Sequence, residues 1–354
     1  MTEQLYGVEA TQFITRTAEP KVIINAGGKP LIAVNNDRLA EYPAHLHGWA
    51  RRWLPILDNP DAVVVNSILD KREWAELDRA IIEAVKPRLI AVADLRAKDL
   101  VSRTTLAEMM NQWRVASERV RPSVNMDGRS QAVSDRTDRK TFAVPIPVIR
   151  TDFEIGLREL LASRKLGASL DTTEAVEAAA SVAEEMERML FVGNQDVVVT
   201  GNTIYGFTTL PQRIQVTGGS WSTATGIVSD VLAWLQIQAD NHYYGPFTLY
   251  CANEQYFQTL NLIPDTPTAV RDYLLSLPQI EDVKPGDFMP TGEVVMVQMT
   301  QTVVDWREAQ SVTARQWSSS DGQATKFAVM AAGAPRLKPD YAGKSGILHG
   351  TGLS

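Results

Sequence analysis

Phe142-Ala-Val-Pro-Ile-Pro-Val-Ile149 opens the stretch of sequence that decides the fold of this chain. A short amphipathic piece, Phe153 to Leu166, follows it, and then a long acidic, alanine-rich segment, Asp171 to Leu190. The chain continues with Phe191-Val-Gly-Asn194 and later with Tyr205-Gly-Phe-Thr-Thr-Leu-Pro211. None of these pieces carries reactive chemistry, so it is their order along the chain that indicates the fold.

The segment from Asp171 to Leu190 predicts a long amphipathic helix. Its apolar residues recur at helical spacing and share one face: Val176, Ala179, Ala180, Ala183, Met186 and Leu190. Its carboxylates lie mainly away from that face: Glu174, Glu177, Glu184, Glu185 and Glu187. Asp171 with Glu174 fits a capping box, and Gly193 fits a stop. Periodicity alone is equally typical of an ordinary packed helix in any α/β protein.

Upstream, Lys71 to Val85 predicts a second helix, with Trp74, Leu77, Ile81 and Val85 on its buried stripe. Between the two helices, Leu106 to Glu118 indicates regular structure, and Asn125-Met-Asp-Gly128 is a turn signal. This block carries interleaved charges of both signs, which are typical of a solvated hairpin.

The order of these elements resembles the lineage of encapsulins and tailed-phage major capsid proteins, whose fold is the Hong Kong 97 type. The resemblance covers most of the chain after about Val63. The residues that carry it are Ser67 to Asp78, Val144 to Ile149, Thr151 to Glu154 (a polar turn), Leu157 to Leu166 (a short helix), Glu174 to Leu190 (the spine helix), Phe191 to Asn194 and Tyr205 to Thr209.

The resemblance implies an α+β Hong Kong 97 fold divided along the chain. The expected parts are an N-terminal arm (1–62), an N-terminal helix region (63–93), an extended loop or E-loop (94–150), a peripheral domain with the spine helix (151–222), an axial domain (223–300), return strands of the peripheral domain (301–338) and a C-terminal tail (339–354).

Local patterns fill in the second half of the chain. Helices are expected at Gly226 to Ala239, from Asn253 and at Thr268 to Leu277, and strands at Pro246 to Cys251, Glu293 to Met299, Val303 to Trp317 and Lys326 to Ala332. We expect axial loops at Asn261 to Pro267 and Pro278 to Pro290. The Gly- and Lys-rich tail is expected to become ordered only on assembly.

Bulk properties exclude several classes of protein. The chain has 354 residues, a formal charge of −7 and one cysteine, Cys251. A net negative charge argues against a dedicated nucleic-acid-binding protein, and one cysteine cannot form an intramolecular disulfide, so the chain suits a reducing cytosol. No apolar run is long enough to span a membrane, and Met1 to Gly7 does not read as a secretory signal.

The candidate subunit-interface residues come from three regions. They are Arg114, Arg119, Arg129, Arg136 and Arg139 of the extended loop, Glu177, Glu184 and Glu187 of the spine helix, and Trp49 and Trp53 of the arm. The loop arginines are expected to pair with the acidic helix face of a neighbouring subunit, and the tryptophans to lie on a neighbour. Plain solvated surface is the alternative for the charged residues.

The sequence predicts no catalytic, cofactor-binding or metal site. His45-Leu-His47 lacks further ligands at metal-site spacing, Gly343-Lys-Ser345 lacks the first glycine of a phosphate loop, and Cys251 lies in an apolar strand. No cofactor and no enzymatic activity are expected.

The leading hypothesis is therefore a major capsid protein of a tailed phage. Pentamers and hexamers would form an icosahedral virion capsid, assembled in the host bacterial cytoplasm around double-stranded DNA contacted non-specifically. Portal, scaffold and decoration proteins are further candidate partners, and no membrane is expected. Two alternatives remain: an encapsulin shell around a cargo enzyme, and an α/β enzyme, motivated only by Ile227 to Met299.

Overall fold

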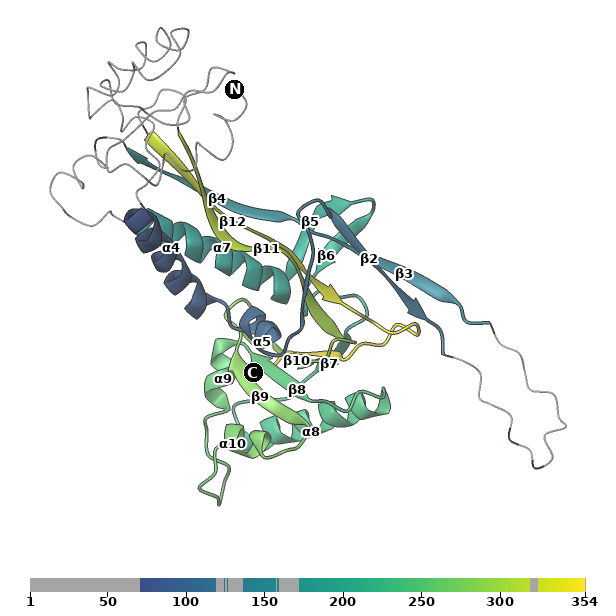
Figure 1. Cartoon of the computed structure of the whole chain (residues 1–354). Helices are drawn as coiled ribbons and strands as arrows, with labels where there is room; N and C mark the ends of the chain where they lie inside the picture. Colours follow the sequence, from purple (N-terminus) through teal and green to yellow (C-terminus); the bar gives the residue numbers. More distant parts are fainter. Residues whose placement is uncertain are drawn as a thin grey trace, which may run out of the picture. The chain divides into compact units, whose positions relative to one another are not determined.

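The computed structural model describes residues 71–118, 124, 126, 136–156, 158, 172–318 and 324–353 (Figure 1). The chain divides into two units. One comprises Met1–Glu73, Glu154–Ser169 and Gln316–Lys326; the other comprises Trp74–Phe153, Leu170–Arg315 and Phe327–Ser354 and holds most of the described residues. The expected arm, with Trp49 and Trp53, lies outside the described residues, as do Arg119 and Arg129.

Helix α4 (Lys71–Val85) confirms the predicted upstream helix, with Leu77, Ile81 and Val85 buried. A 3-10 turn, η2 (Lys86–Arg88), and a short helix, α5 (Ala91–Ala97), follow it. Because α5 spans residues 93 and 94, the expected boundary between helix region and extended loop falls inside a helix.

Helix α7 (Thr173–Phe191) is the predicted spine helix, and Gly193 lies just past its end with a φ of 81°. Its buried stripe is wider than predicted and runs through Ala175, Ala178, Ala179, Val182, Ala183, Met186, Glu187, Met189, Leu190 and Phe191. The predicted stripe members Val176 and Ala180 lie at its margin, half-buried. Small residues on this face let neighbouring elements approach the helix closely.

A four-stranded sheet has the order β1-β11-β12-β4. Its strands are β1 (Val101–Arg103), β11 (Val304–Ser318), β12 (Ala324–Leu337) and β4 (Val148–Gly156). The long strands β11 and β12 confirm the predicted return strands. The polar turn expected at Thr151 to Glu154 is wrong, because these residues continue strand β4, where Phe153 stacks on Phe327 at 5.0 Å. Of the short helix expected at 157–166, only residue 158 is described.

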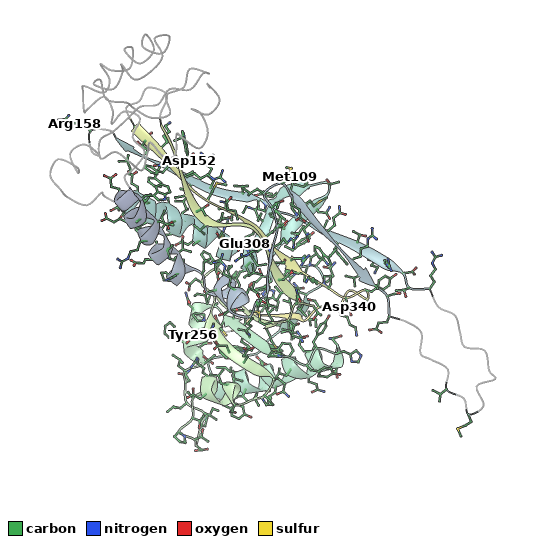
Figure 2. All side chains as sticks on the ribbon, in the orientation of Figure 1. Met109, Asp152, Arg158, Tyr256, Glu308 and Asp340 are labelled. Atoms are coloured by element: carbon green, nitrogen blue, oxygen red, sulfur yellow. The ribbon has the colours of Figure 1, made fainter. Side chains whose placement is uncertain are left out.

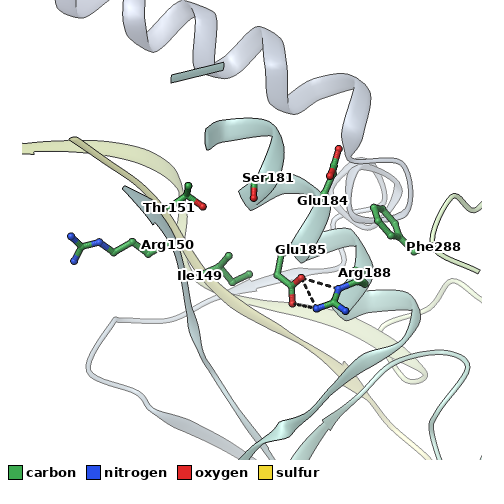
Figure 3. A pocket seen from close by; sticks show the side chains of 8 residues that line it. All are labelled: Ile149, Arg150, Thr151, Ser181, Glu184, Glu185, Arg188 and Phe288. Atoms are coloured by element: carbon green, nitrogen blue, oxygen red, sulfur yellow. Dashed lines mark hydrogen bonds and ion pairs between the residues drawn. The ribbon is translucent and has the colours of Figure 1, made fainter. Parts of the chain in front are cut away.

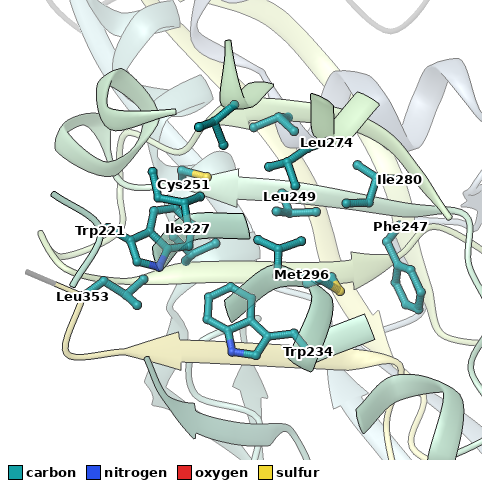
Figure 4. Packing of buried hydrophobic residues seen from close by; sticks show 14 of the residues in the cluster. Trp221, Ile227, Trp234, Phe247, Leu249, Cys251, Leu274, Ile280, Met296 and Leu353 are labelled. Atoms are coloured by element: carbon teal, nitrogen blue, oxygen red, sulfur yellow. The ribbon is translucent and has the colours of Figure 1, made fainter. Parts of the chain in front are cut away.

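A five-stranded sheet has the order β7-β13-β10-β8-β9. Its strands are β7 (Ile214–Thr217), β13 (Ile347–Thr351), β10 (Val294–Gln298), β8 (Phe247–Cys251) and β9 (Ile280–Pro285). Helices α8 (Ala224–Asp240), α9 (Asn253–Gln258) and α10 (Val270–Leu275) accompany it. Trp221, Ile227 and Trp234 pack with Leu249 and Met296 of the sheet to form one apolar core (Figure 4).

Two predictions for this region are wrong. Residues 280–285 of the expected loop form strand β9, which pairs in parallel with β8. The expected tail contributes β13, which lies between β7 and β10 and is buried at Ile347 and Leu348. A short strand with only two large apolar residues is hard to distinguish from a tail by composition alone.

Two hairpins complete the described fold. Strands β2 (Met110–Ala116) and β3 (Arg139–Pro145) pair from Met110↔Pro145 to Ala116↔Arg139, and β5 (Gly193–Val199) pairs with β6 (Asn202–Tyr205). The extended hairpin therefore begins at Met110, later than the predicted start at residue 94. In the part of the chain that the structure describes, no helix is long and apolar enough to cross a bilayer.

Candidate subunit-interaction surfaces

The two glycine motifs of the sequence meet at the end of helix α7. The amides of Phe207 and Thr208 donate to the carbonyls of Leu190 and Phe191 at 3.0 and 2.9 Å. Gly206 lies so close to Gly193 that a Cβ atom on it would approach the Gly193 amide to 2.5 Å. The rings of Phe191, Phe207 and Tyr250 cluster there, with centroids 5.4 to 6.2 Å apart. This junction fixes the spine helix against the five-stranded sheet.

The base of the β2–β3 hairpin is held by the carboxylate of Glu108. It accepts hydrogen bonds from Asn111 Nδ2 at 2.5 Å, from the Thr104 hydroxyl and from Arg307 Nη2 at 3.1 Å. The bonds from Asn111 and Thr104, with a smaller contribution from Arg307, lower the pKa of Glu108 to about 2. Because Arg307 belongs to β11, its hydrogen bond to Glu108 ties the hairpin base to that strand.

A second anchor of the hairpin is the buried ion pair of Arg336 with Asp305. Asp305 is only 1% exposed, and Arg336 Nε donates to its Oδ1 at 2.7 Å, while Lys338 Nζ lies 3.3 Å from its Oδ2. Arg336 also donates to Asn111 Oδ1 at 2.8 Å and lies over the Trp113 ring, 5.9 Å from its centroid. The hairpin base is thereby fixed to β12.

Beyond this base the hairpin presents exposed residues. Arg114, Arg136 and Arg139 are all exposed, and so are Met109, Val124 and Met126 (Met109 is labelled in Figure 2). Lys140 is tied back, since its Nζ donates to the carbonyl of Tyr341 at 2.8 Å and lies over the Tyr341 ring. The three described loop arginines of the prediction therefore share one projecting hairpin.

The acidic face of α7 is smaller than predicted. Glu177 is exposed, and Glu184 Oε1 lies 2.6 Å from Arg88 Nη1 of η2 in the same chain. Glu187 is only 2% exposed and accepts hydrogen bonds from the amides of Ala91 and Val92 at 2.6 and 3.2 Å. The prediction that Glu187 faces a neighbour is therefore wrong: it caps the start of α5. Burial raises the pKa of Glu187 to about 7, against the opposing effect of these amides.

A hollow of about 350 Å³ lies beside this face, between α7 and β4 (Figure 3). It is lined by Ser181, Glu184, Glu185 and Arg188 of α7, by Ile149, Arg150 and Thr151 of β4, and by Phe288. Two of these lining residues, Glu185 and Arg188, pair with each other at 2.8 Å (Figure 3). The mixed polar lining suits a peptide segment with charges of both signs. We name it the α7 hollow.

Helix α5 links three parts of the described chain. Besides its cap from Glu187, its Asp94 accepts hydrogen bonds from Tyr250 Oη at 2.8 Å and Lys284 Nζ at 2.5 Å. Lys98 Nζ reaches Glu281 of β9 at 2.5 Å, and Arg96 Nη2 reaches Glu308 of β11 at 2.7 Å. The helix therefore joins α7 to both large sheets. Sequence reasoning missed it because seven residues carry too little periodicity.

The groups with reactive potential are engaged in packing or pairing. Cys251 is fully buried in β8, and burial raises the pKa of its thiol. His349 Nε2 lies 3.0 Å from Glu293 Oε2, and Arg213 Nε donates to His349 Nδ1 at 3.2 Å. Among the described residues, no group of three or more His, Cys, Asp and Glu residues is placed to hold a metal ion. The candidate functional features of the described residues are therefore the exposed hairpin, the acidic face of α7 with its hollow, and the contacts that hold the hairpin base.

Comparisons with known proteins identify the family of the chain and the fold that it shares with shell proteins. Residues 62–350 match the model of DUF6260, a family of unknown function. A search of curated proteins matches the type 1 encapsulin shell protein EncA of Myxococcus xanthus at 22% identity over 190 residues. That match covers 54% of this chain and 63% of the relative, so the chain spans less than two thirds of the length of the curated relative that it matches.

Solved structures match over more of the chain. The virus-like particle from Pyrococcus furiosus has a TM-score of 0.57 and 18% identity, covering 79% of this chain and 99% of that chain. The capsid of Myoviridae phage XM1 has a TM-score of 0.56 and 12% identity, covering 74% and 92%. At these identities the likeness defines the fold.

Proposed function

The chain belongs to the DUF6260 family and has the α+β Hong Kong 97 fold of capsid and encapsulin shells, and from that premise we propose that it is the major capsid protein of a tailed bacteriophage. Pentamers and hexamers of the chain form an icosahedral shell around double-stranded DNA, which its inner surface contacts non-specifically. The virion is its final location, after assembly in the host bacterial cytoplasm with any portal, scaffold or decoration proteins. Its role in this proposal is structural.

The observation that carries the proposal is the β2–β3 hairpin, which is fixed at its base and exposed along its arms. Glu108, Asp305 and Arg336 hold the base, and the arms present Arg114 and Arg139 away from any core. An anchored hairpin with exposed side chains is suited to reach a second subunit. Contacts that are individually weak become collectively strong when each subunit makes several of them.

We assign the acidic face and the α7 hollow of a neighbouring copy as the partner of this hairpin. Arg114, Arg136 and Arg139 supply positive charge, and Glu177 with Glu184 supplies negative charge. Arg119 and Arg129 belong to the same loop, and Trp49 and Trp53 of the arm stay proposed contacts with another neighbour. Exposed pairs contribute only about 0–1 kcal/mol each, so they set register more than affinity.

The chain length favours a phage capsid over an encapsulin. The match to the virus-like particle uses nearly all of that chain but only 79% of this one, so this chain carries additional sequence. In this proposal the additional sequence supplies further contacts between subunits.

The second candidate is an encapsulin shell around a cargo enzyme, and the match to the encapsulin shell protein of Myxococcus xanthus favours it. The two functions differ in contents. Particles that protect DNA from nuclease, with portal and terminase genes beside the coding gene, support the phage capsid. An enzyme inside the particle, with its gene adjacent, supports the encapsulin.

Electron microscopy of the full chain at high concentration tests both candidates. We expect closed shells. A chain that remains monomeric under all assembly conditions would contradict both functions.

The hairpin contact has its own test, a charge exchange. Arg139→Glu and Glu177→Arg are each expected to slow assembly, because each places like charges opposite one another, and the double variant is expected to recover part of the rate. Light scattering during assembly measures the effect. Arg79→Glu, on the exposed face of α4 beside Glu83, is the matched control. Absence of recovery in the double variant would remove this pair from the interface.

A further inference from the structure

Two exposed apolar surfaces lie at opposite ends of strand β8. The first, which we name the ridge, follows the Cys251 end and consists of Phe257, Leu260 and Leu262, which are 67%, 45% and 62% exposed. The second, the α8 hollow, lies at the Phe247 end and has a volume of about 550 Å³. Figure 4 shows Cys251 and Phe247 at the two ends of the strand.

The α8 hollow is lined by uncharged residues throughout. Its lining includes Leu232, Leu235, Tyr243, Tyr244, Leu277 and Pro278. Leu232 and Tyr244 stay well exposed at its rim. Its volume lies within the range of about 300–1,000 Å³ that is typical of sites that bury a ligand, so it has room for several bulky side chains.

The ridge matches the hollow in chemistry. The segment from Phe257 to Pro264 contains no charged residue, so its burial against an uncharged wall leaves no ion unpaired. Its backbone is ordered beforehand: Leu262 bridges to Ala269, Ile263 N donates to Thr268 O at 3.0 Å, and Arg271 N donates to Thr259 O at 2.8 Å. A preordered segment loses little entropy on binding.

We infer that the ridge of one copy inserts into the α8 hollow of the next copy, and that this contact repeats head to tail around a symmetry axis. The ridge and the hollow of one chain cannot fill each other, because β8 separates them. A heterologous contact between different surfaces closes into a ring when its rotation divides a full turn. The inference rests on the proposed shell function and names the surfaces that form its rings.

Two single substitutions separate the surfaces. Leu262→Asp places a charge on the ridge, and Leu232→Asp places one on the rim of the hollow; both positions are exposed, so the fold is retained. Each variant is expected to stay monomeric at concentrations where the unaltered chain assembles, with the contact weakened about tenfold or more. Thr225→Asp, exposed on the same helix α8 but outside the hollow, is the control and is expected to assemble normally.

Mixing the two variants tests the head-to-tail geometry. A Leu262→Asp subunit retains its hollow and a Leu232→Asp subunit retains its ridge, so an equimolar mixture contains one intact contact per pair. Size-exclusion chromatography with light scattering is expected to show dimers and nothing larger, while each variant alone gives monomers. Thermal unfolding by circular dichroism within a few degrees of the unaltered chain verifies that the variants fold.

Three results would overturn the inference. Shells that form normally from both variants would show that the contact is absent and would leave the proposed function standing. A mixture that stays monomeric would show that the ridge does not meet the hollow. An unaltered chain that never assembles would remove the proposed function and this contact together.

Discussion

Glu187 shows how a single buried carboxyl can make the stability of the fold depend on pH. Its pKa is raised from 4.5 to about 7, chiefly by burial, with Asp94 adding a smaller repulsion. A carboxyl whose pKa is higher in the folded chain stabilises the fold below its unfolded pKa, and this contribution is lost as the pH rises through the folded pKa. The contribution therefore disappears between about pH 4.5 and 7, and amounts to at most about 3.5 kcal/mol at roughly 1.4 kcal/mol per pKa unit.

Glu187→Gln is expected to remove this pH dependence, because the amide is neutral throughout. The variant also loses about 1–3 kcal/mol at all pH values, since an amide NH₂ replaces one acceptor of the α5 amides. Urea unfolding at pH 5, 6, 7 and 8 measures both effects. Glu177→Gln, exposed on the same helix, is the control, and an unchanged slope in Glu187→Gln would contradict the assignment.

Arg336 illustrates the difference between a buried and an exposed ion pair. Its partner Asp305 is buried, whereas Lys326, on the same strand β12, faces an exposed Glu154 at 3.9 Å. Arg336→Ala is expected to lower the free energy of unfolding by about 3–5 kcal/mol, because it leaves a buried charge poorly compensated. Lys326→Ala is expected to cost less than about 1 kcal/mol. Chemical denaturation measures the free energy of unfolding of both variants. Similar decreases in the two variants would contradict a special role for the buried pair.

At the scale of elements, the junction of α7 with the Tyr205–Thr209 turn depends on the absence of a side chain. A Cβ atom on Gly206 would approach backbone atoms of Phe191 and Gly193 to 2.5 Å. Gly206→Ala is therefore expected to destabilise the fold by about 3 kcal/mol, the upper part of the range for overpacking, because the atoms approached belong to the backbone; the loss is measured as a decrease in thermal stability. Gly156→Ala, with open space around it, is the control. A Gly206→Ala protein as stable as the control would show that the two backbones can separate freely.

The elements that the sequence predicts well are those with strong local signals. Helices α4 and α7 carry repeated apolar stripes, and β11 and β12 carry long β-prone runs. Strand β9 was missed because prolines bracket its pattern, and α5 because it is short. These short elements depend on tertiary contacts, which override local propensity.

The sequence indicates which charged side chains are exposed better than it indicates which are buried, and the interface role of the exposed ones stays a prediction. The exposed positions of Arg114, Arg136, Arg139 and Glu177 follow from their polarity. Glu187 follows Ala183 by four residues, so it lies at the margin of the apolar stripe, where either outcome is compatible with the helical period. Its burial depends on the free amides of α5, which no helical pattern reveals. Asp305 likewise has its donor Arg336 far along the chain, and Glu108 has one distant donor, Arg307.

At the scale of the whole molecule, the last described strand is part of the core. Removing residues 345–354 deletes β13 and leaves β7 and β10 without their shared neighbour. We expect this truncation to abolish cooperative unfolding of the isolated subunit, measured by near-ultraviolet circular dichroism and urea titration. Lys344→Ala, an exposed change just before the strand, is the control. If the truncated chain folds normally and loses only assembly, the prediction that residues 339–354 form a tail would be correct after all.

The central place of β13 has a consequence for the timing of synthesis. Strands β7 and β10 both precede β13 in the chain, so the strand that joins them is not available until residue 351 has emerged from the ribosome. The five-stranded sheet therefore closes only after residues 347–351 have been translated. A nascent chain still attached to a polysome lacks the finished apolar core beneath both the ridge and the α8 hollow. If the chain forms a shell as proposed, an incomplete chain is therefore expected to lack the folded surfaces that assembly uses.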